Sequence, residues 1–272
     1  MEGRLLPKYQ GRYQAHPVGY WRDEFPVAAS LGVGLIEFII DQDGISENAL
    51  MTEEGIIQLR DVMGKTGVAV ASVCADCFMA APLHSKDKIV ADQSIANLRH
   101  LILNASKLGI RDIVIPCVDQ SSLRSLDDSA RFVAAIESVM ELAETKKVNL
   151  SLETDLNPET FCRLLERFDS PRITVNYDIG NSASLGYNPR EELSAYGARI
   201  SDVHVKDRKK GGGSVMLGTG DADFDAFFDA LSFLDYTGPF IMQAYRDDEG
   251  VDVFRKQFEW IGPRLMAYIN RK

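Results

Sequence analysis

Apolar and polar positions alternate along the chain in two patterns. Short runs rich in β-branched and other apolar residues are typical of buried strands, and longer stretches with apolar residues three or four positions apart are typical of helices. The strand-like runs lie at 12–16, 35–40, 68–74, 112–116, 149–153, 173–178, 200–206 and 239–242. The helix-like stretches lie at 21–31, 51–66, 88–108, 129–147, 158–168, 189–196, 223–233 and 252–269.

This order predicts an α/β fold in which helices cover a parallel sheet. About eight strand and helix pairs in 272 residues fit a closed (β/α)8 TIM barrel. An open, doubly wound sheet is the alternative, but no Gly-x-Gly-x-x-Gly turn follows the first strand. Neither a linker nor a change of composition interrupts the chain, so we expect residues 1–272 to form one domain. The chemistry of such a barrel lies at the C-terminal ends of its strands.

The composition and charge of the chain argue against some classes of binding partner. The net charge of −10 and the lack of a long basic run argue against a nucleic-acid partner. No apolar run approaches the roughly 18 residues needed to cross a bilayer, and the N-terminal residues lack the apolar core of a signal peptide. Four cysteines in 272 residues do not form a disulfide scaffold. We therefore expect a reduced, cytoplasmic protein without a membrane partner.

The strand-like run at 200–206 carries a metal-seeking imidazole. Asp202, His204 and Lys206 are two positions apart and share one face of the strand. Three other strands end with side chains that offer oxygen ligands. These are Glu153, Asp178 and, after the last strand, Gln243.

We expect these four strand ends to form one metal site. Two carboxylates, an imidazole and an amide oxygen suit Mn²⁺, Mg²⁺, Co²⁺ or Zn²⁺. A helix cap or a salt bridge is the alternative role for each carboxylate, and a structural role is the alternative for the histidine.

Four motifs resemble the xylose-isomerase-like sugar phosphate isomerase/epimerase family. They are Ser-Leu-Glu-Thr-Asp around Glu153, Tyr-Asp-Ile-Gly-Asn at 177–181, His-Val-Lys-Asp at 204–207 and Leu-Gly-Thr-Gly-Asp-Ala-Asp-Phe at 217–224. Within the family, the chain is similar to L-ribulose-5-phosphate 3-epimerases and hexulose-phosphate 3-epimerase relatives. The resemblance implies a TIM barrel, a small-molecule sugar or sugar phosphate as substrate, and one divalent ion, Mn²⁺ first, held by Glu, Asp, His and a final Glu.

The chain departs from the family at the final ligand, where it has Gln243. An amide oxygen can bind a metal, but it cannot carry a proton as a carboxylate does. We assign Glu153 as the general base and Lys206 as a second catalytic side chain that polarises a substrate oxygen or binds phosphate. A Lys206–Asp178 ion pair is the alternative. Without this carboxylate, isomerisation or dehydration is favoured over 3-epimerisation, because 3-epimerisation needs a second acid on the opposite face of the carbon.

Five further side chains are predicted to bind substrate: His16, Glu37, Asn181, Arg208 and Arg246. His16 and Glu37, placed at the ends of the first two strands, could also supply the second proton. Arg208 opens a basic, glycine-rich loop beside the site, and Arg246 follows the last strand as a phosphate candidate. Surface or turn positions are the alternative for each of these residues.

The functional hypothesis is a metal-dependent isomerase or epimerase of a small keto sugar or sugar phosphate. A dehydratase of a cyclic polyol ketone and a non-catalytic sugar-binding relative are the alternatives. An AP endonuclease of the same superfamily needs more histidines than the four in this chain. Cys74-Ala75-Asp76-Cys77 is a lone CxxC and does not predict a redox or zinc site, although Asp76 could face the pocket. We expect a homodimer or homotetramer.

Overall fold

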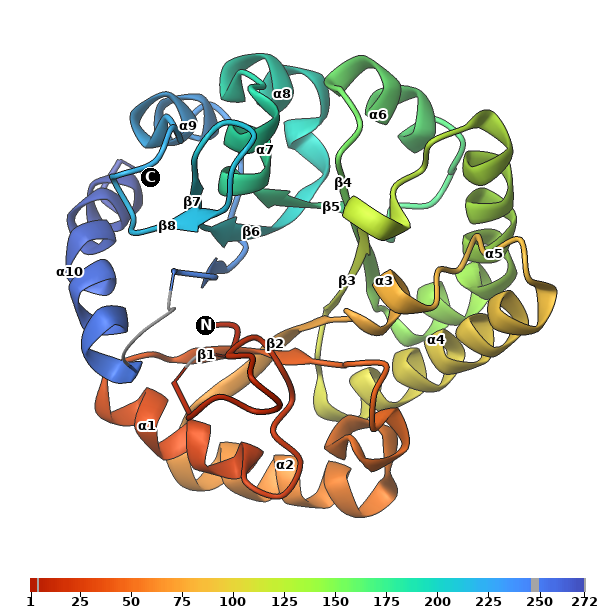
Figure 1. Ribbon diagram of the computed structural model, residues 1–272, viewed down its shortest axis with the longest axis horizontal. Helices are drawn as coiled ribbons and strands as arrows, with labels where there is room; N and C mark the ends of the chain where they lie inside the picture. The colour runs from red at the N-terminus through yellow and green to blue at the C-terminus, as the bar shows by residue number, and fades with distance from the viewer. Residues whose placement is uncertain (4, 246–249, 272) are drawn as a thin grey trace.

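A computed structural model of the protein describes residues 1–3, 5–245 and 250–271. Within these residues, seven parallel strands form one curved sheet in which neighbours in space follow chain order. The strands are β1 (Leu35–Ile39), β2 (Ala69–Cys74), β3 (Asp112–Cys117), β4 (Asn149–Thr154), β5 (Ile173–Asp178), β6 (Ile200–Val205) and β9 (Phe240–Met242). Helices surround the sheet as a ring (Figure 1), which confirms the predicted α/β TIM-barrel architecture.

The N-terminal residues occupy the gap between β9 and β1. The amino group of Met1 donates a hydrogen bond to the Leu35 carbonyl (2.9 Å), and the Glu37 N–H donates to the Met1 carbonyl (2.8 Å). On the other side, the Glu2 N–H donates to the Met242 carbonyl (3.3 Å). Two residues at the start of the chain therefore stand in the place of an eighth strand.

The strand expected at 12–16 is wrong. Gln10 and Gly11 both have positive φ (49° and 79°), and Tyr9 and Arg12 pair across this tight turn. The N–H of His16 donates to the Asp41 carboxylate (2.7 Å) instead of to a neighbouring strand. The segment is thus a loop that lies over the end of the barrel.

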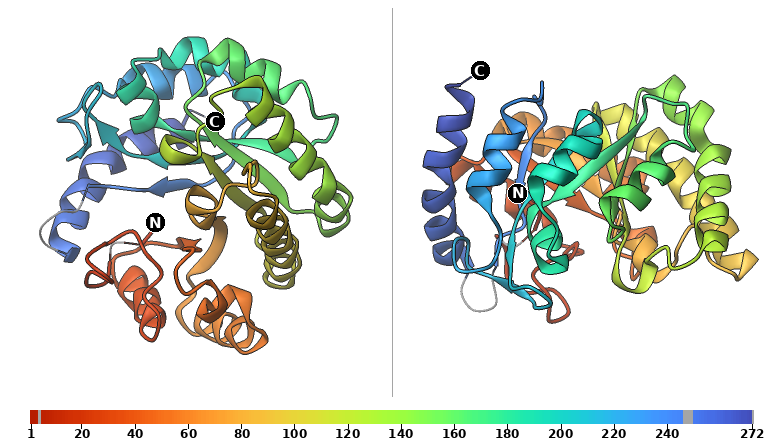
Figure 2. Two further views of the ribbon diagram at one scale, coloured as in Figure 1. Left: turned by 45° about the vertical axis from the view of Figure 1, so that its right-hand side comes forward. Right: turned by 90° about the horizontal axis from the view of Figure 1, so that it is seen from above.

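The helices follow the predicted stretches closely. They are α1 (Glu24–Ser30), α2 (Glu53–Thr66), α3 (Cys77–Ala80), α4 (Lys88–Leu108), α5 (Leu126–Lys146), α6 (Pro158–Leu165), α7 (Ile179–Leu185), α8 (Pro189–Tyr196), α9 (Phe224–Leu231) and α10 (Gly250–Ile269). The two helices that the pattern did not predict are α3, which has four residues, and α7, which begins directly after the last residue of β5. Figure 2 shows the helices packed on the outer side of the strands. Among the described residues, no helix is both long and apolar enough to cross a membrane.

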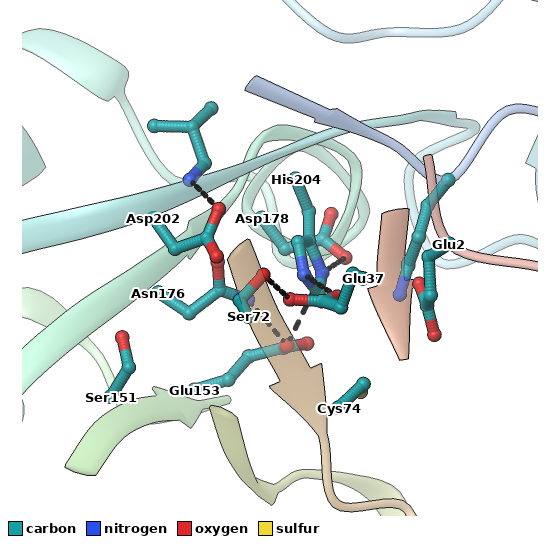
Figure 3. Close-up of polar contacts among 12 residues, drawn as sticks. Glu2, Glu37, Ser72, Cys74, Ser151, Glu153, Asn176, Asp178, Asp202 and His204 are labelled. Carbon is teal, nitrogen blue, oxygen red and sulfur yellow. Dashed lines mark hydrogen bonds and ion pairs between the residues drawn. The ribbon is translucent and has the colours of Figure 1, made fainter. Parts of the chain in front are cut away.

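Strand parity separates an apolar layer from a polar barrel interior. In β5, Val175 and Tyr177 are buried in the core shared with the helices, and Tyr177 stacks on Phe227 of α9 with ring centroids 5.3 Å apart. Asn176 and Asp178 alternate with them and point into the barrel (Figure 3). The alternation that buries the apolar side chains therefore also delivers the polar ones to the interior.

The glycine-rich loop after β6 is held by one carboxylate. The loop begins with a hairpin of β7 (Asp207–Arg208) and β8 (Ser214–Val215). Asp207 is buried and accepts hydrogen bonds from the N–H groups of Gly218 (2.9 Å), Gly220 (2.8 Å) and Ala222 (3.2 Å). A Cβ on Gly220 would lie 1.9 Å from Asp207 Oδ1, which explains the glycine in this motif.

Candidate active site

A cavity of about 490 Å³ opens at the C-terminal ends of the strands. Of the residues predicted for the site, the cavity is lined by Glu153, Asn181, Lys206, Arg208 and Gln243. Lys8, Tyr13 and Gln14, which the sequence analysis did not assign to the site, also line it, as does Asp76, which the sequence analysis had suggested for the pocket. The cavity is large enough for a small sugar derivative.

Glu153, Asp178 and His204 converge beneath this cavity. One candidate ligand atom from each residue lies within 4.8 Å of the others, and all three side chains are buried. Nδ1 of His204 is 3.6 Å from Glu153 Oε2 and 3.9 Å from Asp178 Oδ2 (Figure 3). Asp178 and His204 are register partners on β5 and β6, which fixes their proximity.

The donor set fits a divalent cation. Nδ1 of His204 is buried and has no hydrogen-bond partner in the part of the chain that the structure describes. A buried imidazole nitrogen is normally satisfied, and here it faces two carboxylates instead. An imidazole with two carboxylates is a ligand set used by Zn²⁺, Mn²⁺ and related ions.

The orientation of His204 is fixed from behind by Glu37. The imidazole Nε2 donates to Glu37 Oε1 (2.7 Å), and the other oxygen of Glu37 accepts a hydrogen bond from Ser72 Oγ (2.6 Å). Such a carboxylate partner turns the opposite ring nitrogen towards a metal. Burial alone lowers the pKa of His204, but the charge and hydrogen bond of Glu37, together with the charges of Glu153 and Glu2, raise that pKa well above its ordinary value. A metal ion at Nδ1 would therefore displace a proton.

Two asparagines hold the carboxylate of Glu153. Asn176 Nδ2 donates to Oε2 (2.8 Å) and Asn181 Nδ2 donates to Oε1 (2.6 Å). Burial and the neighbouring charge of Asp178 raise the pKa of Glu153 to about 7. A carboxyl group with such a pKa can take up and release a proton near neutral pH.

Lys206 links Gln243 to the carboxylates. Its Nζ donates to Gln243 Oε1 (2.8 Å) and to Asp178 Oδ2 (3.1 Å). The Lys206–Asp178 ion pair, which the sequence analysis gave as the alternative to a catalytic role for Lys206, is thus present. The amine also lines the cavity, so it remains available to a substrate oxygen.

Arg208 is a cation at the cavity wall. Its Nη1 donates to Asn181 Oδ1 (2.8 Å), and Nε and Nη2 donate to the Gly212 carbonyl (3.0 and 2.8 Å). No carboxylate of the described residues forms an ion pair with it. Asn181 therefore connects this guanidinium directly to Glu153.

Two of the predicted substrate-binding residues that the structure describes, His16 and Glu37, do not line the cavity. His16 is 5% exposed, packs against Trp21 and Phe38, and borders a separate small cavity. Glu37 is the third of five residues in β1, so its expected place at a strand end is wrong, and it lies behind His204. Arg246 lies outside the described residues.

Sequence reasoning did not assign Asn176 or Gln14 to the site. Asn176 shares the strand face of Asp178, two positions away, and this parity was a usable signal. Gln14 comes from the N-terminal loop, whose path over the barrel has no periodic signature. Its Nε2 donates to Glu2 Oε1 (2.7 Å) and to Asp76 Oδ2 (3.3 Å).

The barrel, the cavity and the buried Glu, Asp and His agree with the family to which the sequence is related. A model of the xylose isomerase-like TIM barrel family matches residues 25–264, so the chain belongs to this family. It is 27% identical over 264 residues to L-ribulose-5-phosphate 3-epimerase UlaE of Escherichia coli O1:K1 / APEC, with 93% of each chain covered. Its Salmonella paratyphi A counterpart is 27% identical over 263 residues, also with 93% of each chain covered.

Solved structures share the fold at lower identity. The 3-keto-D-glucoside 4-epimerase YcjR of E. coli superposes with a TM-score of 0.72 at 17% identity, covering 89% of this chain and 94% of that one. The IolI protein, solved with a bound zinc atom, superposes with a TM-score of 0.71 at 14% identity, covering 92% of each chain.

Proposed function

We propose that the protein is a divalent-metal-dependent epimerase or isomerase that acts on a small keto sugar or keto sugar phosphate. The observation that carries the proposal is the unsatisfied Nδ1 of His204, which faces the carboxylates of Glu153 and Asp178 beneath a cavity of sugar size. Membership of the family and the sugar epimerases among its relatives support an enzyme of this class.

Glu153, Asp178 and His204 would hold the ion, with the amide oxygen of Gln243 as a fourth ligand. A bound divalent ion acts as a Lewis acid on the carbonyl and hydroxyl oxygens of a sugar. We favour Mn²⁺, with Mg²⁺, Co²⁺ and Zn²⁺ as alternatives, because the set is rich in oxygen and holds one imidazole. Gln243 Oε1 accepts from Lys206, so ligation by Gln243 requires Lys206 to turn towards the cavity.

Glu153 would remove the proton from the carbon next to the substrate carbonyl. Its side chain lines the cavity, and both of its oxygens are fixed by amide donors. Asn176 and Asn181 thereby hold the carboxylate in one orientation before substrate arrives. Positioning of this kind removes part of the entropic cost of proton transfer.

Lys206 and Arg208 supply positive charge at the cavity wall. Arg208 is bonded to neutral groups, an amide oxygen and a main-chain carbonyl, and retains N–H donors for a ligand. A planar guanidinium suits a phosphate group. We therefore place the phosphate of a keto sugar phosphate beside Arg208 and the reacting carbons beside Glu153.

The test is turnover of a panel of ketoses by metal-free protein reconstituted with Mn²⁺, Mg²⁺, Co²⁺ or Zn²⁺. The panel contains L-ribulose 5-phosphate, L-xylulose 5-phosphate, D-allulose 6-phosphate and the three unphosphorylated sugars, with products separated by chromatography. We expect a metal-dependent, reversible conversion between epimers or isomers. An enone absorbance would instead indicate a dehydratase. Metal binding without turnover of any compound would contradict the proposal and support a sugar-binding relative.

A further inference from the structure

Epimerisation requires two groups that carry protons, and Gln243 cannot be one of them. Inverting a carbon next to a carbonyl requires that a proton leave from one face and that another arrive on the opposite face. Glu153 can serve one face, and an amide cannot serve the other. A second group with a transferable proton must therefore line the same cavity.

Carboxyl groups are the natural candidates, and three line the cavity within the described residues: Glu153, Asp76 and Asp119. Asp119 is exposed and follows β3 at the outer rim. Asp76 is only partly exposed and follows β2, which is separated in the sheet from β4 and Glu153 by β3. Asp76 and Glu153 thus approach one cavity from different strands.

The bonding of Asp76 leaves its proton available. Cys74 Sγ donates to Oδ1 (3.2 Å) and Gln14 Nε2 donates to Oδ2 (3.3 Å). Both partners are neutral, and no lysine, arginine or histidine of the described residues pairs with this carboxyl group. The bond from Cys74 favours the ionised form of Asp76, but burial outweighs it, and no cation in the described part of the chain is present to hold the charge.

We propose that Asp76 is a second catalytic residue, which exchanges a proton with the reacting carbon on the face opposite to Glu153. The role rests on the proposed function. Asp76, which follows β2, would take the acid and base role that a carboxylate at position 243 would otherwise have.

The protonation of Asp76 is consistent with this role. Burial and the nearby charge of Glu2 raise the pKa of Asp76 to about 7. Its acid form is therefore populated at neutral pH, so Asp76 has a proton to donate to the reacting carbon.

Two other proton carriers that line the cavity, Cys74 and Lys206, are less suitable. The Cys74 thiol is buried, which raises its pKa well above the ordinary value, and it is bonded to Asp76 itself. Lys206 donates to Asp178 and Gln243, and the proposed function assigns its amine to a substrate oxygen and not to the reacting carbon.

The proton balance is simple. Glu153 takes the proton from the carbon, the bonding pair passes into the enediolate, and the proton of Asp76 then bonds to the same carbon on its other face. Glu153 ends protonated and Asp76 ionised, and exchange with water restores both. In the reverse direction the two residues exchange roles.

Deuterium exchange distinguishes this role from a structural one. Mn²⁺-loaded wild type, Asp76→Asn and the control Asp127→Asn are incubated in D₂O with L-ribulose 5-phosphate or L-xylulose 5-phosphate, and the hydrogen at carbon 3 is followed by NMR. Asp127 is exposed on α5 and does not line the cavity. We expect Asp76→Asn to lose about 100-fold or more in epimer formation, the size typical of a lost general acid. One epimer, the one that faces Glu153, should still exchange its hydrogen at close to the wild-type rate. Asp127→Asn should match wild type in both reactions.

Two outcomes would overturn the role of Asp76 alone, with wild type active. One is epimer formation by Asp76→Asn at close to the wild-type rate. The other is loss of exchange with both epimers, which would assign Asp76 to the structure of the site. Failure of wild type to convert either ketose, whichever of the four metals is present, would instead contradict epimerisation at carbon 3 and remove the basis for both proposals.

Discussion

Nε2 of His204 lies 2.7 Å from Oε1 of Glu37, and both side chains are completely buried. The contact joins β6 to β1 across the barrel interior and turns Nδ1 of His204 towards Glu153 and Asp178. Ser72 on β2 completes the arrangement through the second oxygen of Glu37. The candidate metal ligand is therefore positioned by groups that never reach the cavity.

Glu37→Gln should weaken metal binding without removing a ligand. The amide would orient the imidazole less strongly and lower its basicity, so we expect the Mn²⁺ affinity to fall about 10-fold to 100-fold. Calorimetric titration of the metal-free variant measures this. Glu24→Gln, which changes a buried glutamate on α1, is the matched control and should bind Mn²⁺ like wild type. Unchanged affinity in Glu37→Gln would show that the contact serves folding only.

Glu153 should make the stability of the metal-free protein depend on pH. Its pKa rises from 4.5 to about 7 on folding, so the stabilising effect of its bound proton is complete below about pH 4.5 and is lost as the pH rises through 7. The loss amounts to on the order of 3 kcal/mol at most. Denaturant unfolding between pH 5 and 8 should show a smaller decline for Glu153→Gln than for wild type. Equal declines would mean that Glu153 is already ionised at pH 5.

Mn²⁺ should reverse this trend. Because the ion requires ionised Glu153 and an unprotonated His204 Nδ1, its stabilisation of the fold should grow between pH 6 and pH 8. Thermal unfolding with and without Mn²⁺ at each pH checks the expectation. A shift in unfolding temperature that does not change with pH would argue against these ligands.

Arg208→Met should discriminate between phosphorylated and unphosphorylated substrates. We expect the KM for a ketose phosphate to rise at least about 10-fold, since a charge-assisted contact is worth roughly 1.5 to 3 kcal/mol, while the unphosphorylated ketose is affected less. Lys209→Met removes the same charge from the next residue, which does not line the cavity, and serves as the control. Equal effects of Arg208→Met on both substrates would place Arg208 in the support of Asn181 instead.

Asp207→Asn should destabilise the glycine-rich loop. The buried carboxylate accepts three N–H groups, and an amide would offer one acceptor and place its own N–H₂ against the others. We expect a loss of about 2 kcal/mol in unfolding free energy, as for a buried hydrogen-bonded group. Asp225→Asn, at a side chain that is 86% exposed, should leave stability unchanged. A similar change in both variants would contradict the structural role of Asp207.

Most of the barrel was predictable because its strands and helices carry strong local signals. The first strand was not, since two residues at the start of the chain fill that place through main-chain hydrogen bonds. A segment of two residues has no periodicity to detect. The short helix α7 was also missed, although Asp178 caps it by accepting a hydrogen bond from the N–H of Asn181 (2.8 Å).

The site was predictable where function and strand parity coincide. Glu153, Asp178 and His204 were expected together because parallel strands end at one edge of the sheet, and the structure brings their ligand atoms together. Sequence reasoning placed Glu37 at the cavity because it took this residue as the end of a strand, whereas β1 continues to Ile39. The link from Gln243 through Lys206 depends on side-chain rotamers, which no sequence pattern encodes.

Titration of the metal-free protein with Mn²⁺ tests the central claim most directly. The account predicts about one saturable site per chain in wild type and a loss of affinity of at least about 100-fold in His204→Gln. His84→Gln, which changes a buried histidine away from the site, should bind like wild type and serves as the control for folding. No saturable binding by wild type, or equal affinity in His204→Gln, would contradict the assignment of Glu153, Asp178 and His204 as the metal site.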